Sequence, residues 1–124
     1  MSTIKDSELS SIGKDEVQWA QRQMQVLEEI KLDFEKRKPL DGLNIGACMH
    51  VTKETANLML TLQSAGANVA LCASNPLSTK DSVAAYLAES GVQVHAIHGV
   101  SNEEFFEHLN SVLDTKPDIT MDDG

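Results

Sequence analysis

The sequence has few aromatic residues and few positive charges. Aromatic residues make up 4% of its 124 residues, so any core must be built from Leu, Val, Ile, Ala and Met. Ten basic against 19 acidic residues give a formal net charge of −9. Nucleic acids and anionic membrane surfaces attract basic patches, so this balance argues against both as partners.

Long apolar runs and cysteine motifs of the metal-binding kind are missing too. No apolar stretch approaches the ~20 residues that a transmembrane helix needs, and the polar residues 1–14 lack the pattern of a signal peptide. Cys48 and Cys72 stand alone, without a CxxC or Cys/His spacing, which is typical of reduced thiols. We therefore expect a cytoplasmic protein that holds no metal.

The composition that remains is that of one globular domain. Hydrophobic residues make up 41% of the chain, which excludes disorder throughout, and the length suffices for one modest core. We expect residues 1–12 to be a flexible lead-in and residues 13–124 to form a single domain.

One long helix is predicted over residues 13–37. Pro39 ends it, because the proline ring cannot continue a helix and restricts the residue before it. Trp19, Val26 and Ile30 widen the apolar stripe that the helix presents. The stripe itself consists of residues three, four or seven apart: Val17, Ala20, Met24, Leu27 and Phe34.

After this helix, short apolar runs alternate with helical segments. The runs predict buried strands over residues 43–48, 68–73, 92–97 and 118–122, and the helices between them cover 53–65, 78–89 and 101–113. Such alternation predicts an α/β fold of three layers, a parallel sheet with flanking helices as in flavodoxin.

Turn residues support these boundaries. Gly66 and Gly91 stand where a left-handed residue would end a helix, each directly before a strand. Ser101 with Glu104 has the spacing of a capping box at a helix start. Ser78 with Asp81 has the same spacing, and predicts that the middle helix begins at residue 78.

The residues that follow each strand are the candidates for a site, because ligands of parallel sheets bind at the carboxyl ends of the strands. After the first strand come His50, Thr52 and Glu54. A histidine exchanges protons near neutral pH, a hydroxyl both donates and accepts, and a carboxylate accepts from an amino group. The alternative is structural: Thr52 caps the next helix and Glu54 favours its positive end.

The other strand ends are less specific by themselves. Asn75 before a proline indicates a turn, and residues 78–81 are typical of a helix start. A zinc site of His50, His98 and the cysteines is disfavoured, since zinc needs three or four convergent ligands. Asp122 and Asp123 end the last strand, where two acids are costly to bury and are therefore candidates for a site.

Four segments together resemble S-adenosylhomocysteine hydrolase in order and separation. They are Lys-Pro-Leu-Asp-Gly at 38–42, Cys-Met-His-Val-Thr-Lys-Glu-Thr at 48–55, Ser-Asn-Pro-Leu-Ser-Thr-Lys-Asp at 74–81 and Asp-Asp-Gly at 122–124. The resemblance covers about residues 13–124, and its four motifs in this order are highly specific although each alone is weak.

The resemblance implies a reversible hydrolysis of S-adenosylhomocysteine to adenosine and homocysteine. In this family a bound NAD first oxidises the ribose, homocysteine is eliminated, water is added, and the ribose is reduced again. His50 and Asp123 match the residues that handle protons, and Asp123 also contacts the substrate. Thr52 matches a substrate-binding threonine and Glu54 the glutamate at the adenine edge. Four further residues match a segment near the ligand: Asn75, Ser78, Thr79 and Asp81.

The resemblance also implies that residues 13–124 lack parts that the family's reaction needs. The family's NAD-binding domain lies further along the chain, so residues 13–124 are expected to be a truncated substrate-binding domain that does not turn over alone. The full-length protein is expected to be a homotetramer that takes a nucleoside thioether. Ser74 replaces a common cysteine and Lys80 a common glutamine. Lys80 leaves two alternatives open: an S-inosylhomocysteine hydrolase and a non-catalytic regulatory homologue. A receiver-type signalling module is disfavoured, because its paired acids would follow the first strand.

Overall fold

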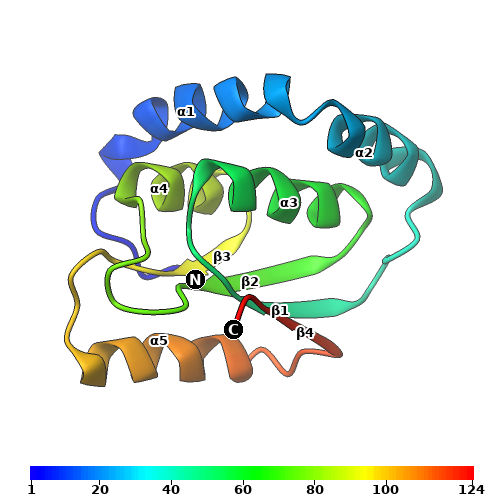
Figure 1. Cartoon of the computed structure of the whole chain (residues 1–124). Coiled ribbons are helices and arrows are strands. Elements are labelled where there is room, and N and C mark those ends of the chain that lie inside the picture. Colours follow the sequence, from blue (N-terminus) through cyan, green and yellow to red (C-terminus); the bar gives the residue numbers. More distant parts are fainter.

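The computed structural model describes all 124 residues and shows a parallel four-stranded sheet between helices (Figure 1). The α/β class predicted from the sequence is therefore confirmed. None of the helices is both long and apolar enough to cross a membrane. The elements, in chain order, are the 3-10 helix η1 (Ser7–Leu9), α1 (Ser10–Gln23), α2 (Gln25–Arg37), β1 (Asn44–Cys48), α3 (Lys53–Ser64), β2 (Asn68–Cys72), α4 (Asp81–Glu89), β3 (Gln93–His95), α5 (Asn102–Leu113) and β4 (Ile119–Asp122).

The strand order is β3-β2-β1-β4. This order corrects the comparison with flavodoxin, whose sheet runs 2-1-3-4-5; it is the order of the first four strands in dinucleotide-binding sheets. The chain places β2 and β3 on one side of β1 and then returns to place β4 on the other. β1 is thus central, and in its register Cys48 lies opposite both Cys72 and Asp122.

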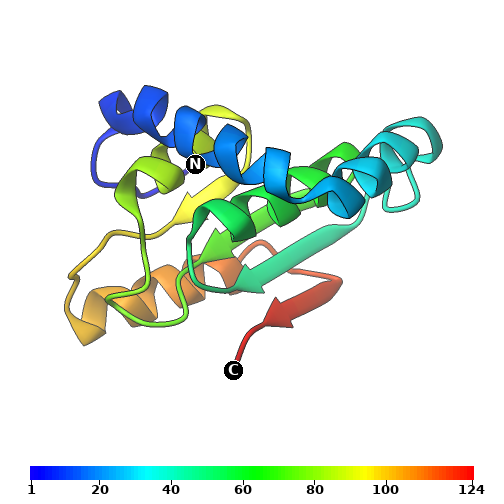
Figure 2. The same ribbon diagram turned by 45° about the horizontal axis from the view of Figure 1, so that its top comes forward.

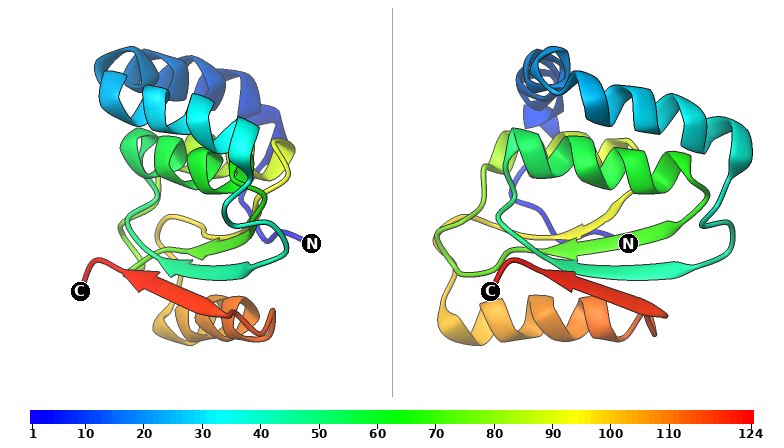
Figure 3. Two further views of the ribbon diagram at one scale, coloured as in Figure 1. Left: turned by 90° about the vertical axis from the view of Figure 1, so that its right-hand side faces the viewer. Right: turned by 45° about the vertical axis from the view of Figure 1, so that its right-hand side comes forward.

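The helices form layers on the two faces of the sheet. α3 and α4 cover one face and α5 the other, while α1 and α2 lie outside α3 and α4 (Figure 3). Successive residues of β1 face opposite sides of the sheet. Ile45 and Ala47 therefore join the main core, and Gly46 faces α5. A Cβ on Gly46 would lie 3.1 Å from atoms of both Pro117 and Val112, so the small residue lets α5 approach closely.

The single helix predicted over residues 13–37 is wrong in two respects. The helix begins at Ser10, and it is interrupted at Met24, whose φ of −115° and ψ of 60° are not helical. No proline or glycine causes the break. α1 packs mainly on α4 and also on α3, whereas α2 packs on α3, so the main packing partner changes at the break at Met24 (Figure 2). Gln21 and Glu28 join the two helices by a hydrogen bond of 2.8 Å.

Within residues 1–12, expected as a flexible lead-in, Ser2 and Thr3 lie along the outer edge of β3, and the residues from Ser7 onward already belong to η1 and α1. Thr3 donates its amide hydrogen to the carbonyl of Val94 at 2.8 Å and accepts from the amide of Ala96 at 3.0 Å. The Ser2 hydroxyl accepts a further hydrogen bond from the Val94 amide. These contacts occupy the edge of β3 that would otherwise be open for pairing.

The predicted start of α4 at residue 78 is also wrong, because Ser78 to Lys80 are held in extended conformation. The Val51 amide donates to the Ser78 carbonyl and the Lys80 amide donates to the Val51 carbonyl, so α4 begins at Asp81. The cap at Ser101 is confirmed: its hydroxyl accepts from the Glu104 amide at 3.2 Å. The positive φ values predicted for Gly66 and Gly91 are present.

The contact between α1 and α4 generates a first prediction. Gly13 lies so close to α4 that a Cβ would stand 1.9 Å from the carbonyl oxygen of Ser82. Gly13→Ala should lower the free energy of unfolding by about 1–3 kcal/mol, although alanine is otherwise the better helix former. Urea denaturation measures the difference. Ser11→Ala on the exposed side of the same helix is the control, and an equal or greater stability of Gly13→Ala would contradict this packing.

The buried histidine of β3 generates a prediction about pH. His95 is 5% exposed, and its ring contacts the hydroxyl of Thr3 at 3.2 Å. Burial, with smaller contributions from His108 and the N-terminal ammonium, lowers the pKa of His95. A lowered pKa means that the unfolded chain binds the proton more readily, so stability is complete above the unfolded pKa of about 6.5 and falls as the pH drops below it.

When the pH is lowered, the free energy of unfolding should therefore fall less in His95→Gln than in the wild type. Urea denaturation at a series of pH values between about 5 and 7.5 measures how steeply the free energy of unfolding depends on pH. This range spans the unfolded histidine pKa. His98→Gln, at an exposed position just beyond β3, is the matched control. Equal slopes for His95→Gln and the wild type would show that His95 does not titrate between folded and unfolded states.

Candidate active site

His50 and Asp123 meet at the carboxyl edge of the sheet, where β1 and β4 end side by side. A carboxylate oxygen of Asp123, Oδ2, accepts the backbone N–H of His50 at 3.0 Å and lies 3.6 Å from ring atom Nδ1. The two side chains are 56% and 31% exposed, so both are accessible to solvent. This is the point at which the strand order reverses, which in open parallel sheets is the usual ligand position. Two candidates named from the sequence thus lie side by side, and their chemical roles stay predictions.

Two serine hydroxyls complete this group from the segment after β2. The Nδ1 atom of His50 makes a hydrogen bond with the hydroxyl oxygen of Ser74. That oxygen lies 3.4 Å from the hydroxyl oxygen of Ser78. Ser78 was predicted as a site residue, whereas Ser74 was noted only as a departure from the family pattern. The sequence offered no signal for the contact, because it depends on the pairing of β1 with β2.

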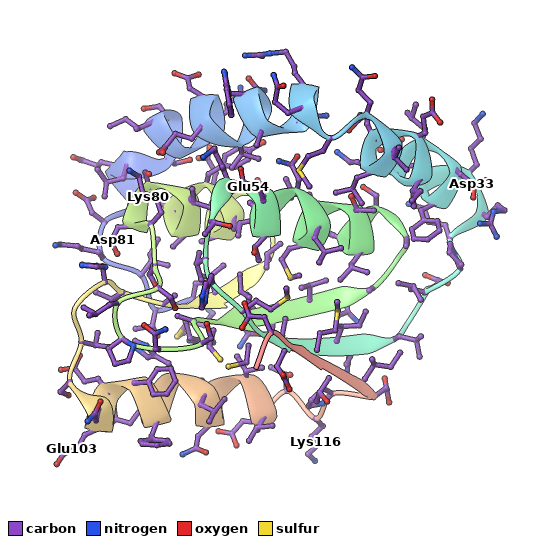
Figure 4. All side chains as sticks on the ribbon, in the orientation of Figure 1. Asp33, Glu54, Lys80, Asp81, Glu103 and Lys116 are labelled. Carbon is purple, nitrogen blue, oxygen red and sulfur yellow. The ribbon has the colours of Figure 1, made fainter.

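Glu54 and Thr52 lie in a second group, at the starts of α3 and α4. Figure 4 shows Glu54 and Lys80 near one another beneath α1. Thr52 accepts the Thr55 amide at 3.3 Å, so it does cap α3, as the structural alternative predicted. A small hollow of about 190 Å³ is lined by Glu16, Thr52, Lys53, Glu54, Lys80 and Val83. Neither His50 nor Asp123 lines it, so the predicted residues divide into two neighbouring groups.

Glu16 of α1 is a member of the hollow that sequence analysis missed. Its carboxylate lies 3.6 Å from the ammonium of Lys80 and also accepts a hydrogen bond from the Ser82 hydroxyl. Ser82 and Glu16 are 66 positions apart, and the pair arises only from the packing of α1 on α4. The contact places the Lys80 ammonium beside an acidic partner.

Asn75 and Thr79 behave differently from one another. The exposed Asn75 side chain accepts the Leu77 amide at 2.9 Å and so shapes the turn before Ser78. Thr79 is 6% exposed, and its hydroxyl oxygen is the buried side-chain polar atom that has no hydrogen-bond partner. An unpaired buried hydroxyl costs free energy, so Thr79 retains a capacity to bond that the turn does not use.

The two cysteines next to the site are disfavoured as nucleophiles, because burial opposes the thiolate form. Burial raises the pKa of the Cys48 thiol, and it raises that of Cys72 to about 12. Both thiols are free and stay protonated near neutral pH. Cys48 instead directs its sulfur to the carbonyl of Ala73 at 3.5 Å. The imidazole, the carboxylates and the hydroxyls remain the candidate reactive groups at this edge.

Neither a metal nor NAD fits the residues at this edge. No three His, Cys, Asp or Glu side chains stand close enough to hold a metal ion. Sheets with this strand order that bind dinucleotides use a glycine-rich turn after the first strand, so that the backbone approaches the pyrophosphate. Here that turn is Met49-His50-Val51-Thr52, without glycine, and the Thr52 side chain occupies the helix start.

Comparisons with known proteins agree on one family. Residues 1–124 match the sequence model described as S-adenosyl-L-homocysteine hydrolase. The adenosylhomocysteinase of Saccharolobus solfataricus is 51% identical over 122 residues, which are 98% of this chain and 29% of that protein. That of Thermococcus kodakarensis is 48% identical over 121 residues, with the same two shares.

A protein named S-inosyl-L-homocysteine hydrolase, from Methanothermobacter thermautotrophicus, is 45% identical over 121 residues, again 98% of this chain and 29% of that protein. The chain thus spans less than a third of the length of these relatives. The match covers β1 and β4 together with the residues that follow them. This chain belongs to the S-adenosyl-L-homocysteine hydrolase family and corresponds to part of the length of its members.

Proposed function

We propose that the chain is the first part of the substrate-binding domain of an S-adenosylhomocysteine hydrolase and that its crevice holds the nucleoside of the substrate. The observation that carries the proposal is the contact between His50 and Asp123 at the switch point of the sheet. The relatives named adenosylhomocysteinase support the reaction that the resemblance implies, the hydrolysis of S-adenosylhomocysteine to adenosine and homocysteine.

The two groups of side chains suit the two ends of a nucleoside. Glu54 offers a carboxylate to the amino group of a base, and the hollow around it is small and polar. His50 and Asp123 offer an acid and a base to the ribose end, where a thiol leaves and water enters. In the hydrolytic direction the thiol gains one proton and the water loses one, so a single imidazole can exchange both.

The rest of the activity is assigned to the remaining part of the protein. NAD, which would supply oxidation and re-reduction of the ribose, is proposed to bind outside residues 1–124, since their first turn lacks the glycines for it. The exposed fraction of His50, 56%, fits a crevice that a second domain closes against water. We further propose a cytoplasmic homotetramer that acts in the methyl cycle, as the resemblance implies.

Binding of adenosine to this chain tests the proposal. An open crevice should hold adenosine weakly, with a Kd on the order of 1 mM. NMR titration should shift the amide signals of His50, Glu54 and Asp123. Asp123→Asn should weaken binding roughly tenfold or more, because a hydrogen bond to a charged group is lost. Asp114→Asn, after α5 at the other end of the strands, is the control. Shifts confined to other surfaces, or none at the solubility limit, would refute the proposal.

A second candidate is the inosine analogue, which the relative from Methanothermobacter thermautotrophicus favours. Adenine presents an amino group as donor, whereas hypoxanthine presents a ring N–H beside a carbonyl oxygen. Lys80 donates and Glu54 accepts, and the two line one hollow. We expect adenosine to bind at least as tightly as inosine, because Glu16 holds the Lys80 charge. Parallel titrations give the ratio, and a clear preference for inosine would assign the chain to the second reaction.

A further inference from the structure

The ring nitrogen Nδ1 of His50 has two oxygen neighbours, and they differ in distance. The hydroxyl oxygen of Ser74 is hydrogen-bonded to it, while the carboxylate oxygen of Asp123 stands at 3.6 Å. A neutral imidazole carries its hydrogen on Nδ1 or on Nε2, and the bond made by one nitrogen fixes the role of the other. The role of Nδ1 therefore follows from the proton of Ser74.

The direction of the serine bonds can be worked out from Ser78. Each hydroxyl has one hydrogen to give and two lone pairs. Ser78 gives its hydrogen to the carbonyl oxygen of Asn75 at 3.1 Å and accepts the amide of Asn75 at 3.1 Å. Its remaining lone pair can only accept. Either hydroxyl could donate in the longer contact of 3.4 Å, and with the Ser78 hydrogen on the Asn75 carbonyl the donor is Ser74.

Once Ser74 has given its hydrogen to Ser78, it can only accept from His50. The hydrogen of the neutral imidazole must then be on Nδ1. The carboxylate of Asp123 near the same nitrogen favours the same assignment, because it attracts the Nδ1–H dipole. The turn itself is held in place: the Gly99 amide donates to the Pro76 carbonyl at 2.7 Å.

We propose that Ser74 and Ser78 are positioning residues that fix His50 in the tautomer with its hydrogen on Nδ1 and so keep Nε2 free as the base. The chain of bonds runs from Nδ1 through the two hydroxyls to the carbonyl of Asn75. The statement about the tautomer stands on this network alone. The statement that Nε2 takes a proton from a ligand rests on the proposed function.

Nitrogen-15 NMR of the histidine rings in the chain without ligand tests the tautomer. The spectra are recorded on the alkaline side of the ring titration that they themselves show, where the ring is neutral. We expect Nδ1–H as the major form of His50. Ser74→Ala should reduce the ratio of Nδ1–H to Nε2–H about fivefold, the effect of one ordinary hydrogen bond. Ser74→Thr, which keeps the hydroxyl, should restore it.

Matched variants separate positioning from loss of structure. Ser78→Ala should shift the ratio in the same direction, since Ser74 is then free to donate to the ring. Ser111→Ala, which removes a hydroxyl bound to a carbonyl of α5, should leave the ratio unchanged. A wild-type ring with its hydrogen on Nε2, or an unchanged ratio in Ser74→Ala, would overturn the proposal; the latter result would assign the tautomer to Asp123 alone.

The same samples distinguish a failure here from a failure of the proposed function. A chain that shows the Nδ1–H tautomer and does not bind adenosine refutes the function and keeps the positioning role of Ser74. A chain that binds adenosine at this edge while its ring carries the hydrogen on Nε2 keeps the function and refutes the positioning role.

Discussion

The pairing of β4 with β1 is the constraint on which the site depends. β1 and β4 are paired from Ile45 with Ile119 to Cys48 with Asp122. Both strands therefore end at the same position along the sheet. His50 and Asp123 follow at once and are joined by a hydrogen bond between backbone and carboxylate. In a sheet of flavodoxin order another strand would stand between β1 and β4, and this bond could not form.

A second set of contacts gives the histidine its surroundings. The extended segment from Ser78 to Lys80 pairs with Val51, which brings the turn after β2 against the turn after β1. This pairing places two serine hydroxyls beside the imidazole and buries Thr79. The segment beside the imidazole is therefore neither strand nor helix, and two backbone hydrogen bonds with Val51 hold it in place.

Much of the fold was predictable because its signals are local. Apolar runs between turn residues predicted every strand to within a few residues, and the left-handed Gly66 and Gly91 appear where helix ends were expected. The strand order was not predictable, since the strands are similar apolar runs whose sequences do not specify which strand pairs with which. The interruption at Met24 was not predicted either, because it depends on how α1 and α2 pack on other helices and not on a local sequence signal.

The candidate site shows the same division. His50 and Asp123 were named from the sequence because both follow apolar runs and because four motifs resemble a known family. Ser74 and Glu16 were missed as members of the site, since each acts through a partner distant in the sequence. Asn75 and Thr52 were named as binding residues, and the structure shows both side chains in capping or turn contacts, which leaves their binding role a prediction.

The most direct test of this account is the detection of short proton–proton distances across β1 and β4 by nuclear Overhauser spectroscopy. The account predicts cross-peaks between the His50 amide and the side-chain protons of Asp123, together with the ladder that pairs Ile45 with Ile119. A ladder that pairs β4 with β3 instead, with no contact between His50 and Asp123, would contradict it.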